Sequence, residues 1–167
     1  MNKKAKTETP PKQPAGKAAG QKGLEQQLDL TTLQRAPGFM IRLLQLQIFE
    51  EFFEYFADAG LSPAEHSILM IVRDNPSVTQ SKLAAALRIQ LPNLVKILAK
   101  LETSSVISRK RATTDKRAVE LTLTSKGKRL TEQASRLADD FNLKTLSALN
   151  ENEREQFLRT LIRLVRF

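Results

Sequence analysis

The sequence predicts a mainly α-helical fold with a small β-hairpin, and three patterns favour this class. From Pro37 onward, apolar residues recur every three or four positions, a spacing that is typical of helices. Residues 79–103 consist of two such segments separated by three residues. Apolar and polar residues then alternate over residues 119–124, as in a half-buried strand. Two helices joined by a short turn and followed by a hairpin make a winged helix-turn-helix.

The composition restricts the chemistry that this chain can perform. Its 167 residues, 41% of them hydrophobic, are enough for one ordinary domain with a core. There is no cysteine and only one histidine, which argues against metal sites and cysteine nucleophiles. We also find no phosphate loop and no nucleophile–base pair, so we expect neither enzyme activity nor a cofactor. No apolar run reaches the roughly 20 residues of a membrane helix, and we expect no membrane partner.

Charge is distributed unevenly along the chain. Residues 1–23 contain six lysines and one acidic residue among Pro, Gly and Ala, which predicts a disordered basic tail. Residues 24–81 carry three basic and eight acidic residues, whereas residues 82–129 carry twelve basic and three acidic residues. The basic segment contains the predicted turn, helix and hairpin. A polyanionic partner is therefore indicated, although a solvated surface would show the same positive charge.

The first helix is predicted to begin near Pro37 and to stop near Gly60. Because its two apolar rows adjoin, we expect it to be buried against more than one neighbour. The rows consist of Phe39, Leu43, Leu46, Phe49, Phe53 and Phe56, and of Met40, Leu44, Ile48 and Phe52.

The next helices have recognisable ends. Ser62 as N-cap, Pro63 at the first position and Glu65 reaching back predict a helix that ends near Asn75. Thr79 is expected to cap the helix after it. A turn at residues 88–90 then leads into a helix from about Leu91 to Thr103, in which Pro92 is tolerated in the first turn.

The remaining elements follow in order. A short strand is expected near residues 107–111, followed by a charged tip and by the alternating strand. Thr124 is expected to cap a long helix, and Asn150 with Glu153 to begin a last helix that is apolar at Leu161, Ile162 and Val165.

The helix of residues 91–103 has the composition of a helix that reads DNA. Its outer face holds Asn93, Lys96 and Lys100, with no acidic residue at its centre. Asn can bond adenine through two hydrogen bonds, and Lys can bond guanine or a phosphate. An ordinary amphipathic helix would show the same periodicity, but it would not explain the basic residues that follow. The candidate DNA-binding residues are Gln90, Pro92, Asn93, Lys96, Lys100, Arg109, Arg111, Asp115, Lys116 and Arg117.

The charged tip of the hairpin is interpreted as a wing. Arg117 suits a narrow minor groove, where the potential is most negative. Asp115 cannot bind phosphate, and we expect it to pair with a nearby arginine and hold the loop in shape. The competing interpretation is that Asp115 is an ordinary turn residue.

Three stretches together resemble the MarR family of bacterial winged-helix regulators: LSPAEHSILMIV, VTQSKLAAALRIQLPNLVKILAKLE and VISRKRATTDKRAVELTLTSKG. The resemblance runs from about Pro37 to the C-terminus. It implies a mostly helical homodimer whose N- and C-terminal helices form the interface and whose two lobes read a palindromic operator. Family members usually repress transcription and release DNA when a small molecule binds between the lobe and the dimer interface.

The sequence departs from the family pattern at two positions. Ser105 stands where a glycine is common, and Gln90 stands where a serine or aspartate often starts the recognition helix. The stretch PGFMIRLLQ further resembles a subgroup tied to the breakdown of aromatic acids or aromatic acyl-CoA thioesters.

The resemblance also implies a division of the chain and a ligand pocket. We expect a basic tail at 1–23, dimerisation and pocket helices at 24–60, a DNA-binding lobe at 61–124 and C-terminal dimerisation helices at 125–167. The pocket is expected between the helix of residues 39–56 and the one that starts at Pro63. Its candidate residues are Arg42, His66, Arg73, Phe39 and Phe49. Arg42 could instead pair with Glu65, and His66 could be an ordinary core or surface histidine.

The expected function is that of a ligand-responsive transcriptional repressor in the bacterial cytoplasm, at the nucleoid. A small aromatic acid or its CoA thioester would release it from its operator. The alternative is an architectural nucleic-acid-binding protein without a ligand. The phenylalanine-rich helix at 39–56 argues against this alternative, because a large dimer region suits the coupling of a ligand to DNA binding.

Overall fold

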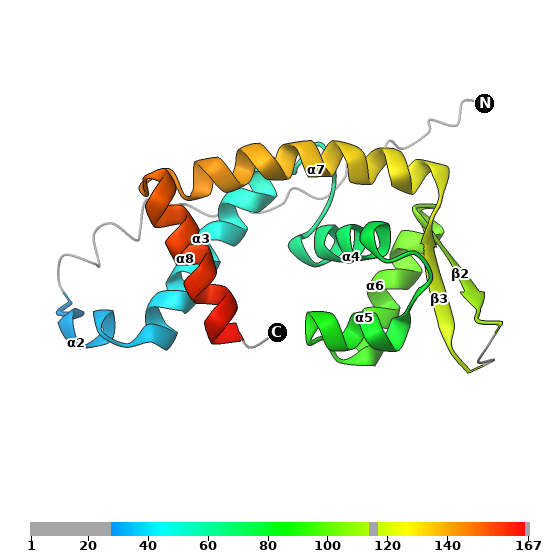
Figure 1. Cartoon of the computed structure of the whole chain (residues 1–167), viewed down its shortest axis with the longest axis horizontal. Coiled ribbons are helices and arrows are strands. Elements are labelled where there is room, and N and C mark those ends of the chain that lie inside the picture. Colours follow the sequence, from blue (N-terminus) through cyan, green and yellow to red (C-terminus); the bar gives the residue numbers. More distant parts are fainter. Residues whose placement is uncertain (1–27, 114–116, 166–167) are drawn as a thin grey trace, which may run out of the picture. The chain divides into compact units, whose positions relative to one another are not determined.

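The computed structural model describes residues 28–113 and 117–165, and it is mainly helical with one small sheet (Figure 1). The chain divides into two compact units, residues 1–42 and 43–167. The predicted basic tail at 1–23 lies outside the described residues. The helices are α2 (Thr31–Gln34), α3 (Pro37–Tyr55), α4 (Pro63–Asp74), α5 (Gln80–Leu87), α6 (Leu91–Thr103), α7 (Ser125–Thr145) and α8 (Glu151–Val165), and the strands are β1 (Val78–Thr79), β2 (Ile107–Arg111) and β3 (Val119–Leu123).

The predicted helix starts are confirmed by their caps. The Ser62 hydroxyl accepts a hydrogen bond from the Glu65 amide, and the Glu65 carboxylate accepts one from the Ser62 amide, which makes a capping box. Thr79 and Thr124 cap α5 and α7 through their side-chain oxygens. At α8, the side chains of Asn150 and Glu153 bond each other's backbone amides in the same reciprocal way as in the capping box.

The sheet has three antiparallel strands in the order β1–β3–β2, and not only the two of the predicted hairpin. Strand β1 pairs Val78 with Leu121 and Thr79 with Glu120. It contains two residues, too few for an alternating pattern to be visible in the sequence. The hairpin itself is confirmed, because β2 and β3 pair along their full length from Ile107–Leu123 to Arg111–Val119.

The core of the second unit lies among the end of α3, the helices α4, α5 and α6, the sheet and α7. Its fully buried side chains come from almost every one of these elements, so they form one continuous core. The largest are Phe56, Ile68, Leu69, Leu83, Leu94, Leu98, Ile107 and Leu121.

A close backbone contact fixes the junction between the sheet and α7. A Cβ atom at Gly127 would lie 2.0 Å from the carbonyl oxygen of Val106. That oxygen also accepts hydrogen bonds from the amide and the side chain of Thr124. The sequence LTLTSKG therefore combines a strand, a helix cap and the one residue type that fits against Val106.

Much of the apolar surface of α3 is exposed in the single chain, so burial of this helix against more than one neighbour stays a prediction. Within α3 only Phe52 is buried, with Phe56 buried just beyond the helix. Leu43, Leu46, Phe49 and Phe53 are exposed, and α8 likewise exposes Leu158, Ile162, Leu164 and Val165. Two adjoining apolar rows predict that two faces of the helix are buried, but they do not show whether the residues that bury each face belong to the same chain or to another.

Candidate nucleic-acid interface

Helix α6 has the bounds that the sequence predicted, and its predicted outer face is exposed. Leu94, Leu98 and Leu101 are buried beneath it. The exposed candidates are Gln90, Pro92, Asn93, Lys96 and Lys100.

Two apolar residues also lie on the exposed surface of α6. Leu91 and Val95 are 43% and 37% exposed, although helical spacing places them on the same half of α6 as the buried Leu94. They are one turn apart, so they form a short apolar strip near the start of the helix. Helical angles order side chains around an axis without showing how far the neighbouring elements reach, so spacing alone does not predict this exposure.

The turn before α6 is tightly bent. Arg88 adopts a left-handed conformation with φ of 53°, and the Ile89 amide donates to the Ala84 carbonyl at 3.0 Å. The Arg88 guanidinium donates to the Val165 carbonyl near the end of α8 at 2.8 Å. The Gln90 side chain makes no capping hydrogen bond, as its departure from the family pattern predicted.

Ser105 occupies a position at which glycine would be favoured. Its φ is 56°, in the left-handed region that L-residues adopt with strain. Its amide donates to the Glu102 carbonyl at 2.8 Å, and its own carbonyl accepts from the Thr124 hydroxyl at 2.6 Å. These two bonds hold the turn that leads from α6 into the wing.

The wing presents basic side chains unequally. Arg109 forms an ion pair with Glu102, which raises the pKa of Arg109 and lowers that of Glu102, so this arginine connects β2 to the end of α6. Arg111 and Arg117 are exposed. Asp115 and Lys116 lie outside the described residues, so the expected pairing of Asp115 with an arginine stays a prediction.

The Lys100 side chain is exposed, but its ammonium group is paired with a buried carboxylate. Its ammonium nitrogen lies 2.7 Å from Glu65 Oε1, and the Glu65 side chain is only 5% exposed. The same carboxylate accepts hydrogen bonds from the amide and hydroxyl of Ser62, both at 2.8 Å. Glu65 was considered above as a possible partner of Arg42. In the structure its carboxylate binds Lys100 and Ser62, the N-cap of its own helix.

Two of the predicted ligand residues take different positions in the second unit. His66 packs edge-on against the rings of Phe52 and Phe56, with centroids 5.7 and 5.3 Å away. Its Nε2 atom is buried without a hydrogen-bond partner, and burial together with the charge of Arg73 lowers the pKa of His66. Arg73 is exposed and bonds Asp74 and Ser135.

The remaining predicted ligand residues are less enclosed. Phe49 is 39% exposed, Phe39 is partly exposed and Arg42 is exposed. The rings against His66 are instead Phe52 and Phe56, which in turn pack on Phe141, and the sequence assigned none of the three to a pocket. Phe141 could have been found from the apolar spacing of α7, but the spacing does not show which helix it meets.

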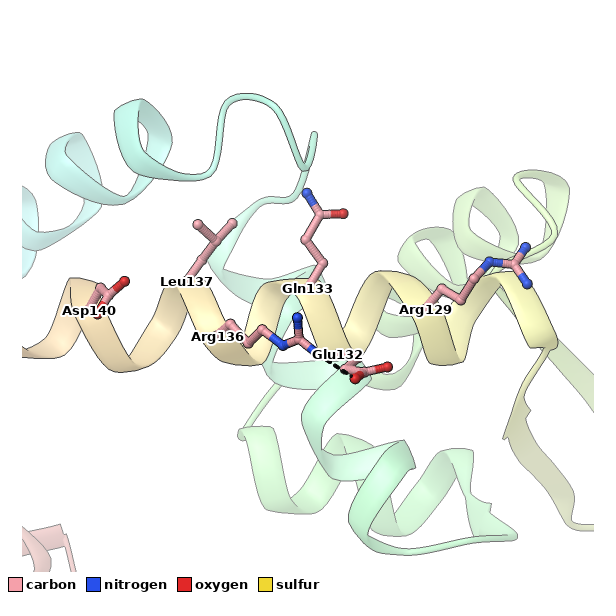
Figure 2. Close-up of a pocket in the computed structure, with 6 residues that line it drawn as sticks. All are labelled: Arg129, Glu132, Gln133, Arg136, Leu137 and Asp140. Carbon is pink, nitrogen blue, oxygen red and sulfur yellow. Dashed lines mark hydrogen bonds and ion pairs between the residues drawn. The ribbon is translucent and has the colours of Figure 1, made fainter.

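The hollows of the surface do not all match the predicted pocket. One hollow, of about 380 Å³, lies on α7. Figure 2 shows the residues that line it, all of them from that helix: Arg129, Glu132, Gln133, Arg136, Leu137 and Asp140. Another, of about 290 Å³, lies between the end of α3 and the start of α4, where a pocket was expected. Its walls include Phe53 and Phe56, and its basic group is Lys100 instead of Arg42, His66 or Arg73.

Among residues 28–113 and 117–165, no helix is long and apolar enough to cross a membrane. Within the same ranges, no cluster of three or more His, Cys, Asp or Glu side chains could hold a metal ion.

These features define a winged-helix DNA-binding protein, and comparisons with known proteins agree. A model of the MarR family matches residues 61–119. The HTH-type transcriptional regulator BilQ of Clostridium symbiosum is 33% identical over 122 residues, covering 70% of this chain and 85% of that protein. The chain belongs to the MarR family, whose members are transcriptional regulators and not enzymes.

Solved structures and a further relative point the same way. The repressor CouR, bound to a 23-mer DNA duplex, has a TM-score of 0.79 and 31% identity, covering 83% of this chain and 99% of CouR. CouR bound to p-coumaroyl-CoA gives a TM-score of 0.76 and 29% identity, covering 83% and 98% of the two chains. A protein ascribed to regulation of the hcr operon in Thauera aromatica is 29% identical, covering 77% of this chain and 78% of that protein.

Proposed function

We propose that this chain is a ligand-responsive repressor that binds a palindromic operator as a homodimer. A small aromatic acid or its CoA thioester releases it from DNA. The observation that carries the proposal is the exposed face of α6, basic and without an acidic residue at its centre, next to a basic wing. The likeness to CouR, which has been solved with DNA and with p-coumaroyl-CoA, supports the effector class.

In this proposal, α6 enters the major groove with its N-terminal half. Asn93 bonds an adenine edge, and Lys96 bonds a guanine or a phosphate. Gln90 and Pro92 lie at the mouth of the groove, and Leu91 and Val95 meet thymine methyl groups. Arg111, Lys116 and Arg117 of the wing contact the backbone and the minor groove, and Asp115 orients an arginine.

Exposed apolar faces support the homodimer. Helices α3 and α8 of the second unit leave large aliphatic and aromatic side chains in water. Exposed apolar rows of this kind are typical of an interaction site. A second copy, offering the same faces, would cover them as a symmetric pair does.

The effector is proposed to bind near His66. The His66 ring packs on Phe52 and Phe56, and its buried Nε2 atom has no hydrogen-bond partner, so a bound molecule could supply both a hydrogen bond and an aromatic ring. The lowered pKa keeps His66 neutral at pH 7, where it can donate or accept one hydrogen bond. Arg42, Arg73, Phe39 and Phe49 remain the other proposed ligand residues, with basic groups meeting a carboxylate or the phosphates of CoA.

A regulator that reads DNA acts where the chromosome lies, so we place this protein in the bacterial cytoplasm, at the nucleoid. The test is footprinting on the DNA upstream of its own gene, with benzoate, p-coumarate and p-coumaroyl-CoA as probes. A protected inverted repeat that is released by an acid or a thioester supports the proposal. Binding along any DNA without release by any probe would favour the architectural alternative.

A further inference from the structure

We propose that Glu65 is a positioning residue for DNA recognition, and that Lys100 acts through it instead of through a DNA phosphate. The pair fixes the far end of α6 against the start of α4 and so sets the direction in which the near end meets DNA. This inference rests on the proposed function, because it concerns how α6 is aimed at the operator.

The surroundings of the Glu65 carboxylate leave one of its oxygen atoms available to a cation. Among the described residues it is the only acidic side chain that is buried, at 4% exposure for the whole residue. Its Oε2 atom accepts from the amide and hydroxyl of Ser62, which leaves Oε1 facing Lys100 at 2.7 Å. Burial raises the pKa of Glu65, but the bonds to Lys100 and Ser62 outweigh burial and lower the pKa overall, so the group is charged at pH 7.

A buried charge that loses its partner is costly, so the buried Glu65 carboxylate favours the contact with Lys100, although the lysine side chain is itself 67% exposed. A phosphate contact by Lys100 would compete with its contact to Glu65 for the same ammonium group. The 2.7 Å contact gives Lys100 an anionic partner inside the protein before any DNA is bound.

The place of Lys100 along α6 supports a positioning role. Asn93, the proposed adenine reader, lies in the first turn of α6, whereas Lys100 lies seven residues later, about 10 Å further along the axis. At the same far end, Glu102 pairs with Arg109 of β2. Two ion pairs therefore attach the C-terminal end of α6 to two different elements. Through the helix, they also set the orientation of its N-terminal end.

The two roles of Lys100 predict different salt dependence. Loss of a phosphate contact flattens the slope of log K against log salt concentration by about 0.9, for every DNA sequence alike. Loss of a positioning contact leaves the slope unchanged and weakens binding only where base edges must be met accurately.

The test uses the full chain and two duplexes of equal length. One duplex is selected from random DNA by the wild-type protein, and the other is its scrambled sequence. The variants are Glu65→Gln, Lys100→Met and Lys100→Arg, with Lys96→Met as a matched lysine on the same helix. Thermal unfolding shows which variants are folded at the binding temperature, and Lys100→Met, which leaves the bonds between Ser62 and Glu65 in place, covers the case in which Glu65→Gln does not fold.

We expect Glu65→Gln and Lys100→Met each to bind the selected duplex about tenfold more weakly, the size of a typical coupling between contacting residues. Binding of the scrambled duplex and both salt slopes should stay as in the wild type. Lys100→Arg should restore most of the affinity, and Lys96→Met should flatten the slope. The inference is overturned if Lys100→Met weakens both duplexes equally with a flatter slope, or if folded Glu65→Gln binds the selected duplex as well as the wild type does. If the wild type itself prefers no duplex, the proposed function fails and this inference fails with it.

Discussion

Basic side chains in the winged-helix lobe fall into two groups that the sequence does not separate. Lys100 and Arg109 are paired with Glu65 and Glu102, so part of their charge serves the fold. Lys96 and Arg111 are exposed on the surface that is proposed to meet DNA. The net charge of the segment therefore overstates the number of phosphates that it neutralises, and the salt slope should be shallower than a count of lysines and arginines suggests.

In the wing, whether loss of Asp115 weakens or strengthens DNA binding distinguishes an orienting role from a simple basic patch. Arg117→Ala should weaken operator binding while changing the free energy of unfolding by less than about 0.5 kcal/mol, because the residue is exposed. Asp115→Ala should also weaken binding, by less, because an arginine that loses its orienting partner has more conformations to lose on contact. Titration of both variants against one operator duplex measures this. Tighter binding by Asp115→Ala at every salt concentration would leave the wing as a simple basic patch.

His66 gives a prediction for pH. Its pKa in the folded protein lies below the ordinary value of 6.5, so near pH 6 the unfolded chain binds more protons than the folded one. Stability that depends on His66 is therefore lost as the pH falls through about 6.5. Urea unfolding at pH 7.5 and pH 5.5 should show a larger loss for the wild type than for His66→Gln. Equal losses would mean that His66 titrates alike in both states.

The junction of β3 and α7 depends on a single glycine. Gly127→Ala places a Cβ atom 2.0 Å from a backbone oxygen that cannot move without breaking the Thr124 bonds. We expect the free energy of unfolding to fall by at least about 2 kcal/mol, measured by urea denaturation. Gly38→Ala is the matched control, since nothing lies within 4 Å of its Cβ, and it should be neutral or slightly stabilising. A neutral Gly127→Ala would refute this account of the LTLTSKG motif.

The helices could be predicted because their signals are local. Ser62, Thr79 and Thr124 act within three residues of themselves, and capping rules apply to such distances. Strand β1 is too short to carry a pattern, and it exists because Val78 and Thr79 meet β3 more than forty residues later. The ion pair of Glu65 with Lys100 likewise joins distant segments, so the sequence showed both charges without showing that they meet.

The assembly of the whole molecule can be tested on α8. Ile162 is 58% exposed in the single chain, so Ile162→Asp should leave the protomer folded and abolish the symmetric pair. Light scattering should show a monomer that no longer binds a palindromic duplex, with Gln156→Asp on the same helix as the control. A dimeric, fully active Ile162→Asp variant would mean that the interface lies elsewhere.

The central claim is that the exposed face of α6 reads base edges, and Asn93 tests it most directly. The measurement is the affinity of wild type and Asn93→Ala for the selected duplex and for duplexes in which each adenine in turn is replaced. We predict that Asn93→Ala loses about 1–3 kcal/mol on the selected duplex and becomes indifferent to one adenine position, with an unchanged salt slope. If Asn93→Ala binds all duplexes as the wild type does, with the same preferences, α6 does not read the operator and the account is contradicted.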